Sequence, residues 1–252
     1  MQKPKPHQIP LLKRAVGAVL CLWALLSFVA TFFVIFLPSM ACYAIPGKKG
    51  QAIFIAISRI WMRTWLTLVG CRIAVKGQHH FTEGQSFIVT CNHNALLDVP
   101  LSSPFIPGAN KTIAKTSFAK IPLFGWYYRK GSVLLNRHSD ASRRHSFEAM
   151  KQVLAQGMHM CIYPEGTRNK TEEPLKPFYD GAFKLAVDTK TAIIPAVIFN
   201  TGKALPIHVS VYFWPHKLGI HFLPAIAVDG LSVQECKQKV YEVMKDYYTK
   251  NA

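Results

Sequence analysis

The chain passes from an apolar strand into a helix within the stretch SFIVTCNHNALLD, residues 86–98. The run 86–91 is typical of a short buried strand, and 97–103 is typical of the start of a helix. The junction between them carries the imidazole of His93 and the carboxylate of Asp98, with four residues between the two. A carboxylate on one ring nitrogen fixes the tautomer of a histidine and leaves the other nitrogen to take a proton. The stretch therefore predicts a general base with its orienting acid, although the same spacing also occurs where both residues serve only the fold.

Strands and helices alternate through the rest of the chain beyond residue 70. Apolar runs predict further strands, and apolar residues at helical spacing predict helices. The predicted strands are 158–163, 192–200 and a pair at 208–213 and 219–223, and the predicted helices are 142–156, 182–189 and a last one from Ser232 to about Thr249. This alternation predicts an α/β fold, a mixed β-sheet flanked by helices, over residues 71–252.

The N-terminal part has the composition of a membrane segment. Residues 15–47 contain no charged side chain. Because about 20 apolar residues span the hydrocarbon core as a helix, 15–37 could cross it, with Pro38 as a natural break. We therefore expect a basic tail at 1–14 followed by membrane-anchoring and interfacial helices at 15–70.

The charges that flank this segment do not choose its orientation, since Lys13 and Arg14 precede it and Lys48 and Lys49 follow it. A helical hairpin, bent near Pro38 and Ser39, satisfies both ends by entering and leaving the same leaflet.

The segment 51–70 favours attachment at the membrane surface. Arg59 and Arg63 lie on a helical face separate from many apolar positions, and Trp61 and Trp65 suit the interface. The alternative is that this helix is buried in the globular domain.

The net charge of +17 requires a reason beyond solubility. No zinc-ligand spacing, helix-turn-helix or RNA-binding signature supports a nucleic-acid partner. Lys and Arg near a membrane are attracted to anionic lipid headgroups. The charge therefore fits an anionic membrane surface and acidic, phosphate-bearing molecules as partners.

The six cysteines predict neither disulfides nor a metal site, because none form Cys-x-x-Cys and two lie in the apolar segment. We expect reduced thiols. Cys91 lies close to His93 in sequence and raises the alternative of a thiol nucleophile, whereas a cysteine at the end of a buried strand is more often a small apolar filler.

Three further motifs follow the first. They are KTSFAKIPLFG at 115–125, YPEGTR at 163–168 and IPAV at 194–197. In this order, the four motifs resemble the sequence blocks of the glycerolipid acyltransferases, the PlsC-like family of 1-acylglycerol-3-phosphate O-acyltransferases. The resemblance covers roughly residues 75 to 225.

The resemblance implies transfer of a fatty acyl group to the sn-2 hydroxyl of 1-acylglycerol 3-phosphate, which forms phosphatidate in phospholipid biosynthesis. The donor is acyl-CoA or acyl carrier protein, with no cofactor and no metal. His93 is then the base and Asp98 its orienter. Members of this size often hold a cytosol-facing catalytic domain against the membrane through an N-terminal helical pair, and the compact chain indicates the bacterial inner membrane.

The resemblance also implies the substrate-binding residues. Lys115 opens the second block, and Glu165, Gly166, Thr167 and Arg168 form part of the acceptor site. Arg137 is implied as a second phosphate ligand. The Glu-Gly-Thr turn could present backbone N–H groups, and arginine binds phosphate through two parallel hydrogen bonds. The alternative for each arginine is a surface salt bridge.

Two departures from the family pattern leave the acceptor open. Ser117 stands where an acidic residue is common, and Tyr179 and Asp180 stand where many relatives have lysines. Lys176 or Lys184 could compensate for the lost charge. The alternatives are O-acylation of another lysophospholipid or of an N-acyl amino-acid lipid, and a membrane-bound lipid-binding or scaffold protein without catalysis. A hydrolase is disfavoured because no Gly-x-Ser-x-Gly elbow is present.

Overall fold

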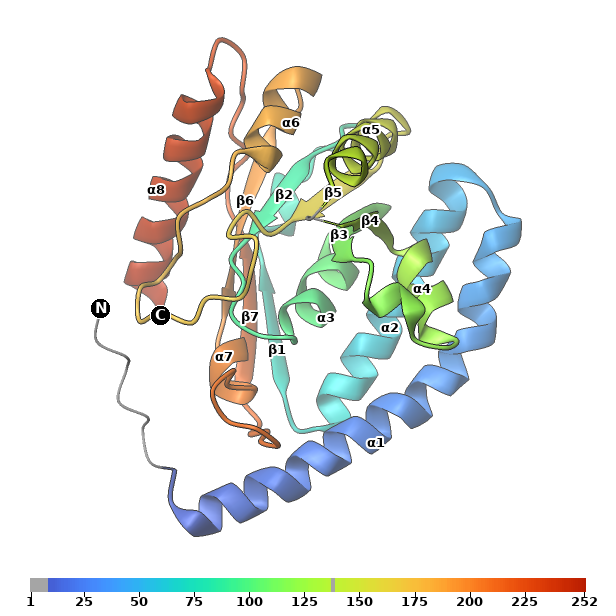
Figure 1. Cartoon of the computed structure of the whole chain (residues 1–252), viewed down its shortest axis with the longest axis vertical. Coiled ribbons are helices and arrows are strands. Elements are labelled where there is room, and N and C mark those ends of the chain that lie inside the picture. The colour runs from blue at the N-terminus through green and yellow to red at the C-terminus, as the bar shows by residue number, and fades with distance from the viewer. Residues whose placement is uncertain (1–8, 137–138) are drawn as a thin grey trace.

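The computed structural model of the chain describes residues 9–136 and 139–252. Figure 1 shows a twisted sheet with helices on both faces, and its strand order is β1-β7-β6-β2-β5-β3-β4. The strands are β1 Arg72–Lys76, β2 Ile88–Cys91, β3 Asn110–Lys115, β4 Ser132–Leu135, β5 His159–Ile162, β6 Ile193–Phe199 and β7 Lys217–Phe222. The helices are α1 Leu11–Ala41, α2 Gly47–Leu68, α3 Asp98–Ser102, α4 Phe124–Lys130, α5 Asp140–Ala155, α6 Gly181–Thr189, α7 Thr201–Ala204 and α8 Val233–Asn251. The predicted mixed sheet flanked by helices is confirmed.

Five neighbouring strands of this sheet, β6, β2, β5, β3 and β4, run in the same direction. Their carboxyl ends therefore meet at one edge, where open α/β sheets bind their ligands. β7 runs antiparallel to β6 and parallel to β1, which makes the sheet mixed. The loops that follow β2 and β5 carry the two most informative sequence motifs, and the topology brings them together.

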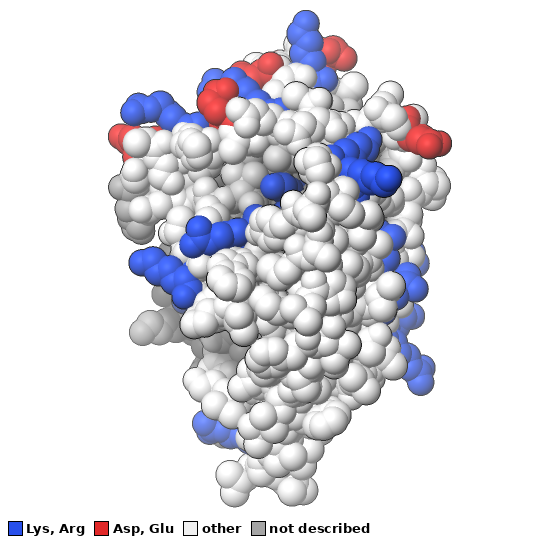
Figure 2. Space-filling model, turned by 90° about the vertical axis from the view of Figure 1, so that its right-hand side faces the viewer, with Lys and Arg blue, Asp and Glu red and all other residues white. Residues whose placement is uncertain are grey.

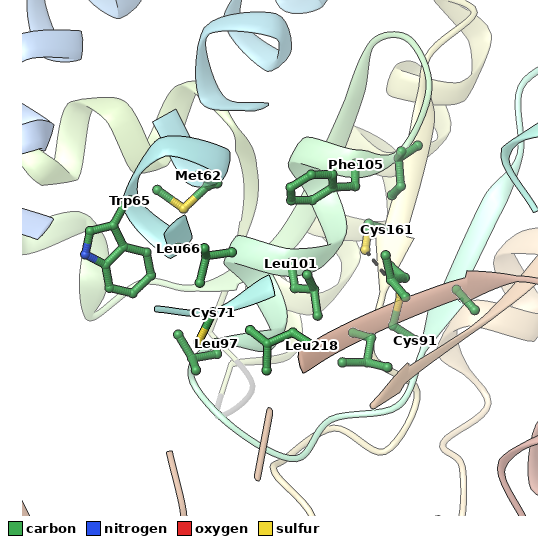
Figure 3. Close-up of a cluster of buried hydrophobic side chains, with 14 of the residues drawn as sticks. Met62, Trp65, Leu66, Cys71, Cys91, Leu97, Leu101, Phe105, Cys161 and Leu218 are labelled. Carbon is green, nitrogen blue, oxygen red and sulfur yellow. Dashed lines mark hydrogen bonds between the residues drawn. The ribbon is translucent and has the colours of Figure 1, made fainter. Parts of the chain in front are cut away.

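Alternate residues of the central strands enter two separate hydrophobic cores. In β2, Val89 and Cys91 belong to the core beneath α2 and α3, whereas Ile88 belongs to the core beneath α5, α6 and α8. Figure 3 shows the first core, in which Met62 and Leu66 of α2 lie near Leu101 of α3. Burial on both faces explains why these strands are continuous apolar runs without polar alternation.

One predicted strand is absent. Residues 208–211 form turns and bends, 212–213 have no regular structure, and Val211 has a positive φ of 49°, which a strand does not allow. The segment packs against α1 instead. Tyr212 lies so close to Gly17 that a Cβ there would meet its ring at 2.4 Å, and the Phe213 N–H donates to the Gly17 carbonyl at 3.0 Å. The predicted hairpin partner of 219–223 was therefore wrong, and β7 pairs with β1 and β6.

α1 and α2 form the predicted helical pair, side by side in Figure 1, but the bend lies later than predicted. α1 continues through Pro38 to Ala41, and the chain turns through a short 3-10 helix, Cys42–Ala44, before α2 begins at Gly47. Pro38 removes one helical hydrogen bond but does not end α1, which continues for three more residues.

α2 belongs to the globular core. Trp61 and Trp65 are buried, and their indole N–H groups donate to Thr31 Oγ1 at 2.9 Å and to the Ala24 carbonyl at 3.1 Å. The Arg59 guanidinium donates to two backbone carbonyls, those of Pro104 and Ile106. The prediction that both tryptophans lie at the membrane interface was wrong, since they join α2 to α1.

The other face of α1 is apolar and exposed. Its outward large side chains include Val19, Leu22, Trp23, Leu25, Leu26, Val29, Phe33, Val34 and Leu37. Figure 2 shows a broad surface with few charged side chains, with most Lys and Arg gathered above it and along its margins. Within the described residues, one helical stretch, Leu11–Ala44, is long and apolar enough to cross a membrane.

A buried asparagine links β2 to β6 where their ladder ends. The Asn92 amide donates to the Ile198 carbonyl at 3.0 Å and accepts from the Ile198 N–H at 2.6 Å. We expect Asn92→Ala to lower the free energy of unfolding by about 2 kcal/mol or more, because both buried backbone groups lose their partner. Denaturant unfolding in detergent measures this. Asn94→Ala, whose side chain has no hydrogen bond within the described residues, should cost less than about 0.5 kcal/mol; equal stability of the two variants would contradict this account.

Candidate active site

The predicted contact between His93 and Asp98 is formed. His93 Nδ1 lies 2.7 Å from Asp98 Oδ2, and Asp98 is fully buried at the start of α3. The same oxygen accepts the backbone N–H groups of Asn94 at 2.6 Å and Ala95 at 2.8 Å. Three donors therefore hold the Asp98 carboxylate, and this arrangement selects the histidine tautomer with its proton on Nδ1.

The opposite edge of the His93 ring is open. Its side chain is 19% exposed, and Nε2 has no hydrogen-bond partner in the part of the chain that the structure describes. The Tyr163 ring lies against the imidazole with 4.6 Å between centroids, and the Tyr163 hydroxyl is held by Ser102 Oγ at 2.6 Å. Nε2 is thus the atom that can accept a proton from a bound substrate.

Glu165 ties the β5 loop to the β2 loop. Its carboxylate is fully buried, with Oε1 accepting from the His93 N–H at 2.8 Å and Oε2 from the Lys176 N–H at 3.1 Å. The Asn169 N–H also donates to the His93 carbonyl at 2.6 Å. The sequence predicted that Glu165 forms part of the acceptor site; the structure shows its carboxylate bound to the backbone of His93 and Lys176, and contact with an acceptor stays a prediction.

The environment of Glu165 disfavours its charged form. Burial raises the pKa of Glu165 to about 7, although the His93 and Lys176 N–H groups and the Lys176 ammonium act in the opposite direction. A buried carboxyl in this position is therefore close to its midpoint near neutral pH.

The turn after Glu165 does not form the predicted cradle of backbone donors. The Gly166 N–H donates to the Tyr163 carbonyl at 3.0 Å, and the Thr167 N–H donates to the Glu165 carbonyl at 2.8 Å. Gly166 has a φ of 71°, a conformation that favours glycine. Gly166 and Thr167 therefore close the turn, and this part of the prediction was wrong.

Two predicted cations lie at the same sheet edge. Arg168 is half-buried and forms no ion pair with any residue in 9–136 or 139–252. Lys115 is exposed at the carboxyl end of β3, the strand next to β5. Arg137 lies outside the described residues, two positions after the end of β4. The structure thus places Arg168 and Lys115 at the edge where the parallel strands β2, β5 and β3 have their carboxyl ends.

Metal and thiol chemistry find no support in the described residues. No group of three or more His, Cys, Asp or Glu side chains in residues 9–136 and 139–252 could hold a metal ion. Cys91 is fully buried, and its thiol lies in the hydrophobic core 3.9 Å from Cys161 Sγ (Figure 3). The hydrogen bond with Cys161, together with burial, raises the pKa of Cys91, so the thiol-nucleophile alternative was wrong.

Comparisons with known proteins identify the family. The family model described as Acyltransferase matches residues 72–199, which include every residue of the site described above. The chain belongs to the acyltransferase family.

Two individual relatives are both named as 1-acyl-sn-glycerol-3-phosphate acyltransferases. Human 1-acyl-sn-glycerol-3-phosphate acyltransferase alpha is 30% identical over 168 residues, 66% of this chain and 58% of that protein. The 1-acyl-sn-glycerol-3-phosphate acyltransferase of Borreliella burgdorferi is 28% identical over 198 residues, 76% of each chain. The match thus spans less than two thirds of the human relative's length.

A solved structure shows the same fold. The crystal structure of the 1-acyl-sn-glycerophosphate (LPA) acyltransferase PlsC from Thermotoga maritima superposes with a TM-score of 0.79 at 24% identity, covering 94% of this chain and 97% of that one.

Replacing the orienting carboxylate tests the pairing. We expect Asp98→Asn to lower kcat for acyl transfer by about 10²- to 10⁴-fold, because the amide no longer fixes the Nδ1–H tautomer or stabilises the imidazolium. Steady-state kinetics with a labelled acyl thioester measure this. Asp188→Asn, on the exposed side of α6, is the matched control and should stay within about two-fold of wild type; an unimpaired Asp98→Asn would remove the carboxylate from the mechanism.

Glu165 predicts a pH-dependent stability. Its pKa rises from 4.5 to about 7 on folding, so its contribution to stability is greatest below pH 4.5 and is lost as the pH rises through 7. A shift of this size corresponds to about 3 kcal/mol. The unfolding free energy of wild type relative to Glu165→Gln should therefore fall by up to that amount between pH 4 and 8, as measured by unfolding in detergent.

The control is Glu172→Gln, an exposed residue of the same loop, which should show no such trend. A wild-type advantage over Glu165→Gln that is independent of pH would show that Glu165 stays charged when buried.

Proposed function

We propose that the chain transfers a fatty acyl group from an acyl thioester to the sn-2 hydroxyl of 1-acylglycerol 3-phosphate, forming phosphatidate for phospholipid biosynthesis. The observation that carries the proposal is the His93–Asp98 pair, with Nε2 open, at a sheet edge that also carries Arg168 and Lys115. The names of the relatives, 1-acyl-sn-glycerol-3-phosphate acyltransferases, support the choice of acceptor.

The proposed mechanism needs one base. The acceptor hydroxyl gives its proton to His93 Nε2 as its oxygen attacks the thioester carbonyl, and Asp98 stabilises the imidazolium that forms. The tetrahedral intermediate then expels the thiolate, which takes the proton from His93 and leaves as the free thiol. The base returns to its neutral form, and no covalent enzyme intermediate is needed.

We propose that the donor is acyl-CoA or acyl carrier protein and that no cofactor takes part, because a thioester is already activated for acyl transfer. Both donors are acidic, and the chain carries a net charge of +17. This charge favours encounter with either of them.

A second candidate changes the acceptor and keeps the chemistry. Tyr179 is 70% exposed, and Asp180 forms a salt bridge with Lys237 at 2.7 Å, so neither position supplies positive charge to the acceptor. This favours O-acylation of another lysophospholipid or of an N-acyl amino-acid lipid as the alternative. A non-catalytic lipid-binding role has no such observation in its favour.

An acceptor panel tests the proposed function. The purified chain is given labelled acyl-CoA or acyl carrier protein with lysophosphatidate, other lysophospholipids and N-acyl amino acids. We expect phosphatidate from lysophosphatidate, and we expect His93→Ala to lower its formation by about 10²-fold or more. Transfer to another acceptor alone would overturn the acceptor assignment, and product that persists undiminished in His93→Ala would overturn the mechanism.

We propose that the exposed apolar face of α1 lies in the bilayer and holds the catalytic domain at the cytoplasmic face of a bacterial inner membrane. This face carries large apolar side chains and no charge over residues 15–41, while most of the buried side of the helical pair packs on the domain. Basic residues along the margin of this surface suit anionic headgroups.

Charges on this face should weaken membrane binding. Leu26 and Phe33 are 57% and 56% exposed, and the transfer of each from water into lipid is worth about 1.5–3 kcal/mol. We therefore expect Leu26→Glu with Phe33→Glu to lower the affinity for anionic liposomes by about ten-fold or more in flotation assays. Thr249→Glu on α8 adds the same charge per site and should leave binding unchanged; if the double variant bound as wild type does, α1 would not be the anchor.

A further inference from the structure

The proposed acceptor carries a phosphate, yet Tyr179 and Asp180, which follow the YPEGTR loop and lead into α6, are not basic. Tyr179 points to solvent and the Asp180 carboxylate faces Lys237 of α8. If the chain binds an anionic acceptor, its positive charge must come from other residues. Two lysines, Lys176 and Lys184, flank these positions.

Lys184 faces away from the loop. Its ammonium lies 3.3 Å from the Asp188 carboxylate, one turn further along α6, and 5.9 Å from the centroid of the Phe147 ring of α5. Its charge is therefore paired with Asp188 and lies over the Phe147 ring, near α5 and α6.

Lys176 faces the loop. Its ammonium donates to Thr167 Oγ1 at 2.6 Å and lies 3.4 Å from the Thr167 carbonyl, next to Arg168 in sequence. It forms no salt bridge within the described residues. A lysine ammonium has three N–H donors, so after the bond to Thr167 it can still donate to an anion.

Glu165 links the backbone of this lysine to the backbone of the base. One carboxylate accepts the backbone N–H of His93 with one oxygen and the backbone N–H of Lys176 with the other. In a 1-acylglycerol 3-phosphate, the attacking hydroxyl and the phosphate are on adjacent carbons. A cation that binds the phosphate must therefore lie close to the base that takes the proton. The Glu165 bridge holds the backbone of Lys176 relative to that of His93, and the Lys176 ammonium is near enough to Glu165 to act against the rise of its pKa.

We propose that Lys176, together with Arg168, forms the anion site that binds the acceptor phosphate and determines specificity for a phosphate-bearing acceptor. This inference rests on the proposed function, since it assigns the phosphate site of the same reaction.

Kinetics with paired acceptors test the proposal. In Lys176→Met we expect KM for lysophosphatidate to rise by about ten-fold or more, because a charge-assisted hydrogen bond is lost, while kcat stays within about two-fold. KM for 1-monoacylglycerol, which lacks the phosphate, should not change. Lys184→Met is the matched control and should behave as wild type, and Lys176→Arg should restore most of the loss.

A purely structural role for Lys176 predicts different results. It would impair both acceptors equally and would lower the thermal stability of the Lys176→Met variant. Equal effects on the two acceptors, or a Lys176→Arg variant as impaired as Lys176→Met, would overturn the proposal.

A binding measurement separates failure of this inference from failure of the proposed reaction. In a His93→Ala background without turnover, lysophosphatidate should bind in detergent micelles about ten-fold more weakly when Lys176 is also replaced by Met. If wild type fails to acylate lysophosphatidate but its binding depends on Lys176, the reaction is wrong and the anion site stands. If wild type acylates it and Lys176→Met changes neither KM nor binding, the reaction stands and Lys176 is not its phosphate ligand.

Discussion

The buried carboxylate of Glu165 joins two loops that are far apart in the sequence. One oxygen holds the backbone of His93 after β2, and the other holds the backbone of Lys176 beyond β5. Removing this carboxylate from water is costly, and burial raises its pKa to about 7. The surrounding packing offsets that cost, and the loops that carry His93 and Lys176 are thereby fixed relative to each other. Asp98 orients the His93 ring through its hydrogen bond to Nδ1.

The fold makes this arrangement possible because five parallel strands end at one sheet edge. The base follows β2, the YPEGTR loop follows the adjacent β5, and Lys115 ends β3 beyond it. Asn92 anchors the first loop to β6, so the base sits on a rigid support. On one side of the sheet, α2 packs between the sheet and α1. We assign the outer apolar face of α1 to the bilayer. The acyl chains of both substrates would then lie on the same side as the lipid.

The sequence predicted the elements whose signals are local. Apolar runs predicted β2, β5 and β6, helical spacing predicted α5 and α6, and the Ser232–Glu235 capping box that predicted the last helix is present. Features that depend on distant contacts were missed or wrong. Residues 208–213 have the composition of a strand but pack on Gly17 of α1. The amphipathic pattern of α2 was interpreted as that of a helix at the membrane interface, whereas its tryptophans face α1. The hydrogen bond of Glu165 to the His93 N–H and that of Tyr163 to Ser102 each join residues 61 or more positions apart. No spacing in the sequence signals such contacts.

The central claim is that Asp98 and Glu165 hold His93 as a neutral base with its proton on Nδ1 and with Nε2 open. Nitrogen-15 NMR of the histidine-labelled chain in detergent micelles reports the tautomer directly, and the His93→Ala spectrum assigns the signals. The account predicts that His93, at a pH where its ring is neutral, has a protonated Nδ1 and an unprotonated Nε2, and that Asp98→Asn abolishes this preference. A His93 ring with its proton on Nε2 in the wild-type chain would contradict the account, because that nitrogen could not then accept the proton of the acceptor hydroxyl.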